Sequence, residues 1–162
     1  MKRSGNHLLR PLGILLAIAL SVLVVISGMA YVKKISVDGQ GYASKVYRES
    51  ALLQRTRSIP PDITVYTNLM LPIVLYTGRI TYRVPLKVNN STQRLNETYD
   101  SEMNSMASDI RDSSALLVYF SRGPNWFVLP TVEEIGRYVP LHTLAKENDG
   151  GVYEAFPDTM GE

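Results

Sequence analysis

One uncharged segment constrains this chain more than any other feature of its sequence. No residue between Arg10 and Lys33 carries a formal charge, and most of them are apolar. At ~1.5 Å per residue, a helix over residues 11–32 is roughly 33 Å long, which is enough to cross the hydrocarbon core of a bilayer. Ser21 and Ser27 do not forbid insertion, because their hydroxyls can bond to helix carbonyls. The segment therefore predicts one transmembrane helix.

A cleaved signal peptide is the alternative interpretation, with Gly28 and Ala30 as the small residues before the cut. The anchor is preferred because the apolar run is longer than the ~7–15 residues of a signal-peptide core. Basic residues flank the run on both sides: Lys2, Arg3 and Arg10 before it, Lys33 and Lys34 after it. Their balance places residues 1–10 in the cytoplasm. Both interpretations predict that the rest of the chain is extracytoplasmic.

Length and composition limit the classes of function. The chain has 162 residues, enough for an anchor and one domain, and its 45% hydrophobic and 20% charged residues are typical of a globular protein. A net charge of +2 gives no reason to expect a nucleic-acid partner. The absence of cysteine excludes a disulfide scaffold, thiolate metal sites and a cysteine nucleophile.

Residues 33–58 form the predicted juxtamembrane linker, a polar joint at 36–41 followed by a helix over 42–58. Apolar or small residues recur at helical spacing in that helix. The helix could lie on anionic lipid, but packing of its apolar stripe on the domain is the simpler interpretation. Pro60 and Pro61 end it. The extracytoplasmic domain is then expected over residues 59–157, with a tail over 158–162.

The domain pattern alternates strands and helices. Strands are predicted over 63–67, 80–84, 115–120, 141–145 and 152–156, and helices over 69–76, from Asn90 to Ile110, and over 131–138. The helix over 69–76 is apolar nearly all round and is expected to be buried, with Asn68 as its N-cap. The order β-α-β-α-β-α-β-β predicts an α/β fold with a small, mostly parallel sheet in three layers. An Asp-Gly turn returns the last strand as an antiparallel edge strand.

A compact signature lies at the start of the domain. It comprises Tyr66-Thr67-Asn68 at the end of the first strand, Tyr76-Thr77-Gly78-Arg79 at the end of the first helix, and Val84-Pro85 at the end of the second strand. In this order and spacing it resembles the C-terminal extracytoplasmic domain of integral-membrane glycosyltransferases that use polyprenyl-phosphate sugars, the superfamily related to protein mannosyltransferases. The resemblance covers about residues 59–156. Tyr66, Thr77, Gly78 and Pro85 are its structural signature.

The resemblance implies an accessory role. In that superfamily the catalytic acidic residue lies in a loop after the first of many membrane helices, whereas one such helix is predicted here. The expected function is a membrane-anchored, non-catalytic domain that packs on or assists a polytopic catalytic part, with membrane lipid as a further partner. The alternative is a free-standing anchored interaction or sensory domain with no transferase activity. Whether the chain is itself an enzyme stays open.

Most cofactor and nucleophile motifs are missing. The first strand-to-helix turn has no Gly-x-Gly-x-x-Gly, so nicotinamide and flavin dinucleotides are not expected. The sequence has no P-loop and no Gly-x-Ser-x-Gly elbow. His7 precedes the anchor and His142 lies in a predicted strand, so no histidine metal cluster is expected. No cofactor and no metal ion are therefore predicted.

Four residues remain as binding candidates: Asn68, Arg79, Tyr76 and Trp126. An arginine and a helix N-terminus can both hold a phosphate or a carboxylate. In the structural alternative Asn68 caps the helix, Arg79 satisfies carbonyls at its C-terminus, and the aromatic residues pack. The two acidic pairs have structural explanations too. Asp109 and Asp112 stand near the end of a helix, and Glu133 and Glu134 belong to a capping box. Asn89, Asn90 and Asn96 begin Asn-x-Ser/Thr triplets, which accept glycans in eukaryotes.

Overall fold

The computed structural model describes residues 9–89, 91–112, 114–122 and 127–156. The chain divides into two compact units, and the second begins at Val46. In the second unit the order of elements after the linker is β1-α4-β2-α5-β3-α6-β4-β5, which confirms the predicted alternation of strands and helices.

The first unit is dominated by one long helix, α1 (Leu9–Asp38). Its part from Gly13 to Asp38 is long and apolar enough to cross a membrane, and none of that part is buried within the protein. The predicted span over 11–32 falls inside α1. The helix continues past Lys33 and Lys34, beyond the start of the expected joint at 36–41.

The linker is not one helix. Residues 42–58 were predicted to be continuous, but the structure has a short 3-10 turn, η1 (Gly41–Ala43), then α2 (Lys45–Arg48) and α3 (Ala51–Arg57). The break comes at Ser50, whose hydroxyl accepts a hydrogen bond from the backbone N–H of Leu53 at 3.0 Å and so starts a new helix. Leu52 and Leu53 are buried.

The second unit is built on a five-stranded sheet in the order β2-β1-β3-β5-β4. The strands are β1 (Thr64–Thr67), β2 (Tyr82–Arg83), β3 (Ala115–Phe120), β4 (Leu141–Glu147) and β5 (Gly150–Ala155). β1 lies parallel to both β2 and β3, whereas β5 is antiparallel to β3 and to β4. β2 has two residues, fewer than the five expected over 80–84.

The prediction of a mostly parallel sheet with β5 at its edge is wrong. The sheet is mixed, most of its paired positions are antiparallel, and β5 lies between β3 and β4. Gly150 permits this arrangement. Its φ is +155°, and a Cβ there would meet the Tyr119 carbonyl oxygen at 2.1 Å. Only glycine lets the start of β5 approach β3 so closely.

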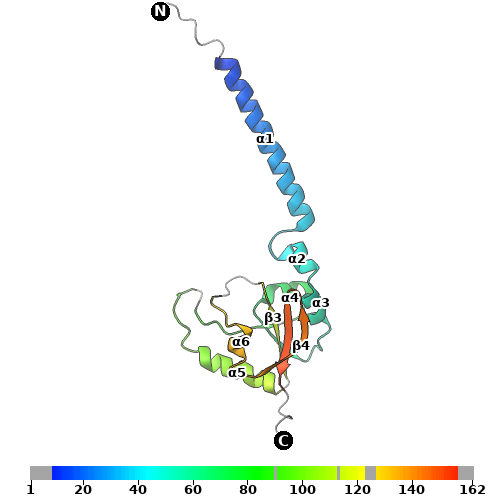
Figure 1. Ribbon diagram of the computed structural model, residues 1–162, viewed down its shortest axis with the longest axis vertical. Coiled ribbons are helices and arrows are strands. Elements are labelled where there is room, and N and C mark those ends of the chain that lie inside the picture. The colour runs from blue at the N-terminus through cyan, green and yellow to red at the C-terminus, as the bar shows by residue number, and fades with distance from the viewer. Residues whose placement is uncertain (1–8, 90, 113, 123–126, 157–162) are drawn as a thin grey trace, which may run out of the picture. The chain divides into compact units, whose positions relative to one another are not determined.

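Helices cover both faces of the sheet. α3 contacts α4 (Met70–Thr77) and the strands β3 and β5, and α5 (Tyr99–Arg111) contacts the same two strands. Figure 1 shows α3 and α4 together on one side of the domain and α5 on another. α6 (Val132–Ile135) joins the core on the α5 side. That core includes Met103, Met106, Ile110, Leu117, Ile135 and Val139.

α5 begins later than predicted. Residues from Asn90 were expected to start it, but Asn90 lies outside the described residues and the helix begins at Tyr99. Before it, Val88 forms an antiparallel bridge with Leu95, and Gln93 has a φ of +57°. Leu95 was assigned to the apolar stripe of the helix, yet it is 80% exposed. The local reversal of the chain therefore overrides the helical spacing.

Candidate functional site

Three signature residues, Thr77, Gly78 and Arg79, border a cleft of about 630 Å³. Residues 56–64 form one wall and residues 77–82 the other. The cleft lies where β1 and β2 begin, the opposite end of the strands from the usual ligand site in an open α/β sheet. The lining side chains include Arg57, Asp62, Thr64, Thr77, Arg79 and Tyr82.

Arg79 uses its guanidinium to hold the chain just before β1. Nη1 donates to the Ile59 carbonyl at 2.8 Å, and Nη2 donates to the carbonyls of Pro60, at 2.6 Å, and of Ile63. Burial lowers the pKa of Arg79, and the nearby charge of Asp62 raises it. The structural alternative expected Arg79 to satisfy carbonyls at the end of α4, but its carbonyl partners belong to the segment 59–63 instead.

The end of α4 is closed by three neighbouring residues. Gly78 has a φ of +70°, and its N–H donates to the Val74 carbonyl at 2.9 Å. Such a left-handed residue just past a helix favours glycine, as predicted. The Thr77 hydroxyl donates to Ile73 O at 2.6 Å and accepts from the Arg79 N–H at 3.2 Å. The carbonyl of Tyr76 is bound by Arg57 of α3, whose Nε donates at 3.0 Å.

Asn68 does not cap α4, so that prediction is wrong. The N-cap residue is Leu69, which forms no side-chain cap hydrogen bond. The Asn68 amide instead bonds to the backbone of Phe120 in both directions: Nδ2 donates to the carbonyl oxygen and Oδ1 accepts from the N–H, each at 2.8 Å. It joins the ends of β1 and β3, because those two strands are parallel neighbours.

The binding candidates do not form one site. Asn68 follows β1, whereas Tyr76 and Arg79 lie at the far end of α4, about 12 Å of helix away. Trp126 lies outside the described residues. Asn68 and Arg79 therefore form no joint anion site. The Asn68 amide and the Nη atoms of Arg79 bond to backbone atoms, whereas Arg79 Nε is buried with no hydrogen-bond partner among the described residues.

The two remaining signature residues, Tyr66 and Pro85, also pack within the domain. The Tyr66 hydroxyl donates to Asp109 Oδ2 at 2.6 Å, which ties β1 to α5. Burial, followed by this hydrogen bond to a carboxylate, raises the pKa of Tyr66 above its ordinary value. Pro85 is buried just after β2. The hydrogen bond from Tyr66 thus gives Asp109 a structural role, and no catalytic role is needed to account for this carboxylate.

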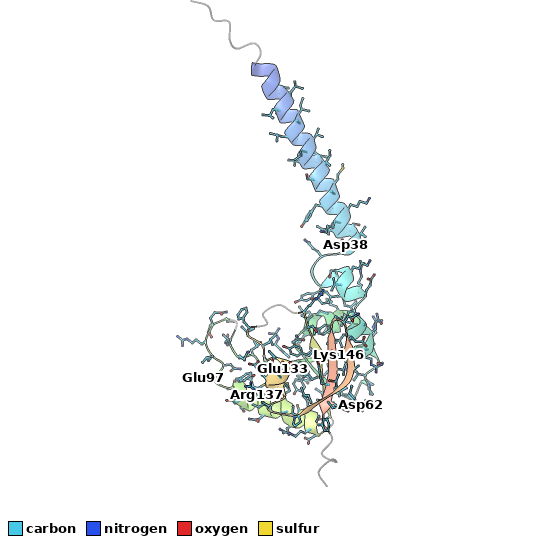
Figure 2. The ribbon with its side chains drawn as sticks, viewed as in Figure 1. Asp38, Asp62, Glu97, Glu133, Arg137 and Lys146 are labelled. Carbon is cyan, nitrogen blue, oxygen red and sulfur yellow. The ribbon has the colours of Figure 1, made fainter. Side chains whose placement is uncertain are left out.

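The other acidic residues are dispersed. Glu134 and Thr131 form the predicted capping box, and Lys87 Nζ lies 3.1 Å from Glu134 Oε2. Figure 2 labels Asp62, Glu97 and Glu133, which lie well apart on the domain. Within the described ranges, no three His, Asp or Glu side chains are grouped so that they could hold a metal ion. His142 is exposed and its ring contacts Phe156 edge-on.

A second, polar hollow of about 560 Å³ lies just after β2, at the carboxyl ends of the strands. Its lining includes Arg83, Pro85, Asn96, Thr98 and Glu102. Asn96 Nδ2 donates to Leu86 O at 3.0 Å and to Glu102 at 3.2 Å, and its Oδ1 accepts from Thr98. Because that amide nitrogen is engaged, the folded domain does not offer Asn96 as a glycan acceptor.

Sequence reasoning missed two features of this domain. Asp149 was assigned only to the hairpin turn, but its carboxylate accepts hydrogen bonds from the Ser50 hydroxyl and the Leu52 N–H and so helps to cap α3. No local pattern links positions that lie 99 residues apart. The second feature is the surface of α4. Leu71, Val74 and Leu75 are exposed, although the helix was expected to be buried.

Comparison with known proteins gave no match: no family model, no curated protein and no solved structure is similar to this chain.

Proposed function

We propose that the chain is a membrane-anchored, non-catalytic extracytoplasmic domain that assists a polytopic glycosyltransferase using polyprenyl-phosphate sugars. One observation carries the non-catalytic part of this proposal. The side-chain amide of Asn68 and the two Nη atoms of Arg79 bind the backbone of the domain itself. Side chains that hold the domain's own backbone together suit an accessory domain better than an active site.

Two further observations support the proposal. The helix α1 meets the length and composition needed for a membrane span, which fits an anchor. The signature-bearing elements β1, α4 and β2 occur in the order and spacing on which the resemblance rests. The second candidate function is a free-standing anchored interaction domain. It is favoured by the exposed apolar face of α4, because such a surface suits a partner of any kind.

The test has an activity arm and a partner arm. In the activity arm, the purified full chain in lipid is incubated with a polyprenyl-phosphate sugar and an acceptor extract, and no transfer is expected. Turnover that is lost in Glu133→Ala or Asp109→Ala would overturn the non-catalytic role.

In the partner arm, the full chain is isolated from native membranes in a mild detergent and its companions are identified by mass spectrometry. A polytopic protein with an acidic loop after its first membrane helix is the expected companion. The control bait keeps residues 1–45 and replaces the rest with an unrelated domain. Recovery of the same companion by that control, or of no polytopic companion, favours the free-standing domain.

A further inference from the structure

One face of α4 is apolar and exposed. Leu71, Val74 and Leu75 follow the i, i+3, i+4 spacing of a single helical stripe, and they are 54%, 40% and 65% exposed. The opposite face of the helix packs on the domain through the buried Pro72 and Ile73. Both faces of α4 are therefore apolar in sequence, but only one of them is buried by the domain.

One arginine lies beside this stripe. The last turn of α3 carries the exposed Arg55 and Arg57, and Arg57 is the one that contacts α4. Arg57 reaches the C-terminal end of α4, where it donates to the carbonyl of Tyr76, the residue after Leu75. Neither α3 nor α4 contains Asp or Glu. Asp62, on the loop before β1, interacts with Arg79. The α3–α4 surface thus combines apolar side chains with arginines.

The chain itself keeps this surface near a bilayer if α1 spans one. Residues 39–50 join the end of α1 to the start of α3. At about 3.5 Å per residue this connection reaches at most roughly 40 Å. A surface tethered so closely meets the bilayer at a high effective concentration, so even a small apolar contact is populated.

We infer that the α4 stripe, with Arg57 at its C-terminal end, lies in the headgroup region of an anionic bilayer. The inference rests on the anchor in the proposed function and not on any transferase partner. Leucine and valine enter the boundary between headgroups and acyl chains, and the charge of Arg57 attracts lipid phosphates. Anionic lipid is the occupant that fits both the charge of α3 and the tether, whereas a second copy would bring the same arginines close to one another.

The absence of cysteine from the chain allows a clean test. Leu75→Cys in the full chain carries a nitroxide label and is reconstituted into phosphatidylcholine vesicles with and without phosphatidylglycerol. Accessibility is measured to oxygen, which concentrates in lipid, and to a water-soluble nickel chelate. Ser105→Cys is the matched control, because Ser105 is exposed on α5, on the other face of the sheet.

The expected result is a several-fold higher oxygen-to-nickel ratio at position 75 than at position 105, increased further by the anionic lipid. Adding Leu71→Asp should lower the oxygen-to-nickel ratio at position 75 towards the ratio at position 105. The melting temperature should stay close to that of the labelled parent. Equal ratios at the two positions overturn the inference. So does spin–spin broadening at position 75 that disappears on dilution with unlabelled chain, since it identifies a second copy as the occupant. The sugar-transfer and companion experiments are unaffected by either outcome.

Discussion

The side-chain amide of Asn68 and the backbone of Phe120 form a two-way hydrogen-bonded pair, with both distances at 2.8 Å. An amide side chain has one donor group and one acceptor, and the end of β3 offers one carbonyl and one N–H in the same plane. The pair extends the contact between β1 and β3 beyond the last residues of their ladder. It replaces the helix cap that the local sequence suggests.

Asn68→Ala should destabilise the domain by about 1–3 kcal/mol, because two backbone groups of Phe120 lose their partners in a half-buried place. Asn68→Asp should also destabilise it, since a carboxylate cannot donate to the Phe120 carbonyl. Denaturant unfolding of the full chain in detergent measures both effects. Asn104→Ala, at an exposed position on α5, is the control and should unfold like the parent. A parent-like Asn68→Ala would contradict the clamp.

Gly78→Ala should cost about 1–2 kcal/mol, the penalty for an L-residue in the left-handed conformation. A Cβ at position 78 meets no atom within 4 Å, so the expected loss is conformational and not steric. Gly78→Val should cost more, because a β-branched side chain is especially unfavourable at positive φ. Gly136→Ala is the matched control, since Gly136 ends α6 with a φ of −58°. Equal melting temperatures for the two alanine variants would count against this account.

Arg79→Ala should destabilise the domain by on the order of 2 kcal/mol, because carbonyls of the segment 59–63 lose a charged donor. Arg79→Lys should recover little, since an ammonium group cannot reproduce the planar fork that reaches several carbonyls. Hydrogen exchange of the amides in residues 59–67 should accelerate in both variants. Arg83→Ala, an exposed arginine on β2, provides the comparison. If Arg79→Ala unfolds like the parent but a bound anion is lost, Arg79 is a binding residue instead.

The capping box predicts an acid-dependent loss of stability. The N–H of Thr131 donates to the Glu134 carboxylate at 2.7 Å and, together with Lys87, holds the pKa of Glu134 below its ordinary value of 4.5, although burial opposes this. A carboxyl whose pKa is lower in the folded state contributes stability above its unfolded pKa and loses it as pH falls through the folded pKa.

The stability difference between the parent and Glu134→Gln should therefore be constant above about pH 5 and shrink as the pH falls towards about 3. Denaturant unfolding across that range is the measurement. Glu97→Gln, at an exposed position outside the capping box, is the control. If the difference in unfolding free energy between the parent and Glu134→Gln is constant over the whole pH range, the ionised Glu134 carboxylate does not stabilise the domain.

The predicted orientation places Gln40 and all later residues outside the cytoplasm, because basic residues precede the apolar run. Protease added outside intact cells or spheroplasts should digest the domain, and the same protease should spare it in inverted vesicles. Moving the basic residues, by changing Lys2, Arg3 and Arg10 to Gln while Lys33 and Lys34 stay, should reduce the fraction in this orientation. A domain shielded from outside attack in intact cells contradicts the orientation.

The sequence alone determined the features that depend on neighbouring residues. The uncharged run predicts α1, the alternation of apolar segments predicts the order of strands and helices, and local chemistry predicts the capping box of Thr131 and the positive φ of Gly78. Each of these follows from hydrogen bonds or sterics within a few positions, or from the total apolarity of one segment. The Asp-Gly turn also predicts a glycine with positive φ at position 150. The turn does not predict that the backbone of Gly150 approaches Tyr119 so closely.

Only the tertiary structure decided which distant groups meet. Asn68 can cap a helix or bond to a strand, and the parallel pairing of β1 and β3 selects Phe120, 52 positions away. The same holds for Arg79, whose carbonyl partners lie across a crossover, and for Asp149, which reaches Ser50. The apolar composition of α4 predicts burial, but the domain covers only one face of the helix. Long-range pairing is chosen by the free energy of the whole packed unit, so side chains with several possible local partners are assigned only when the sheet order is set.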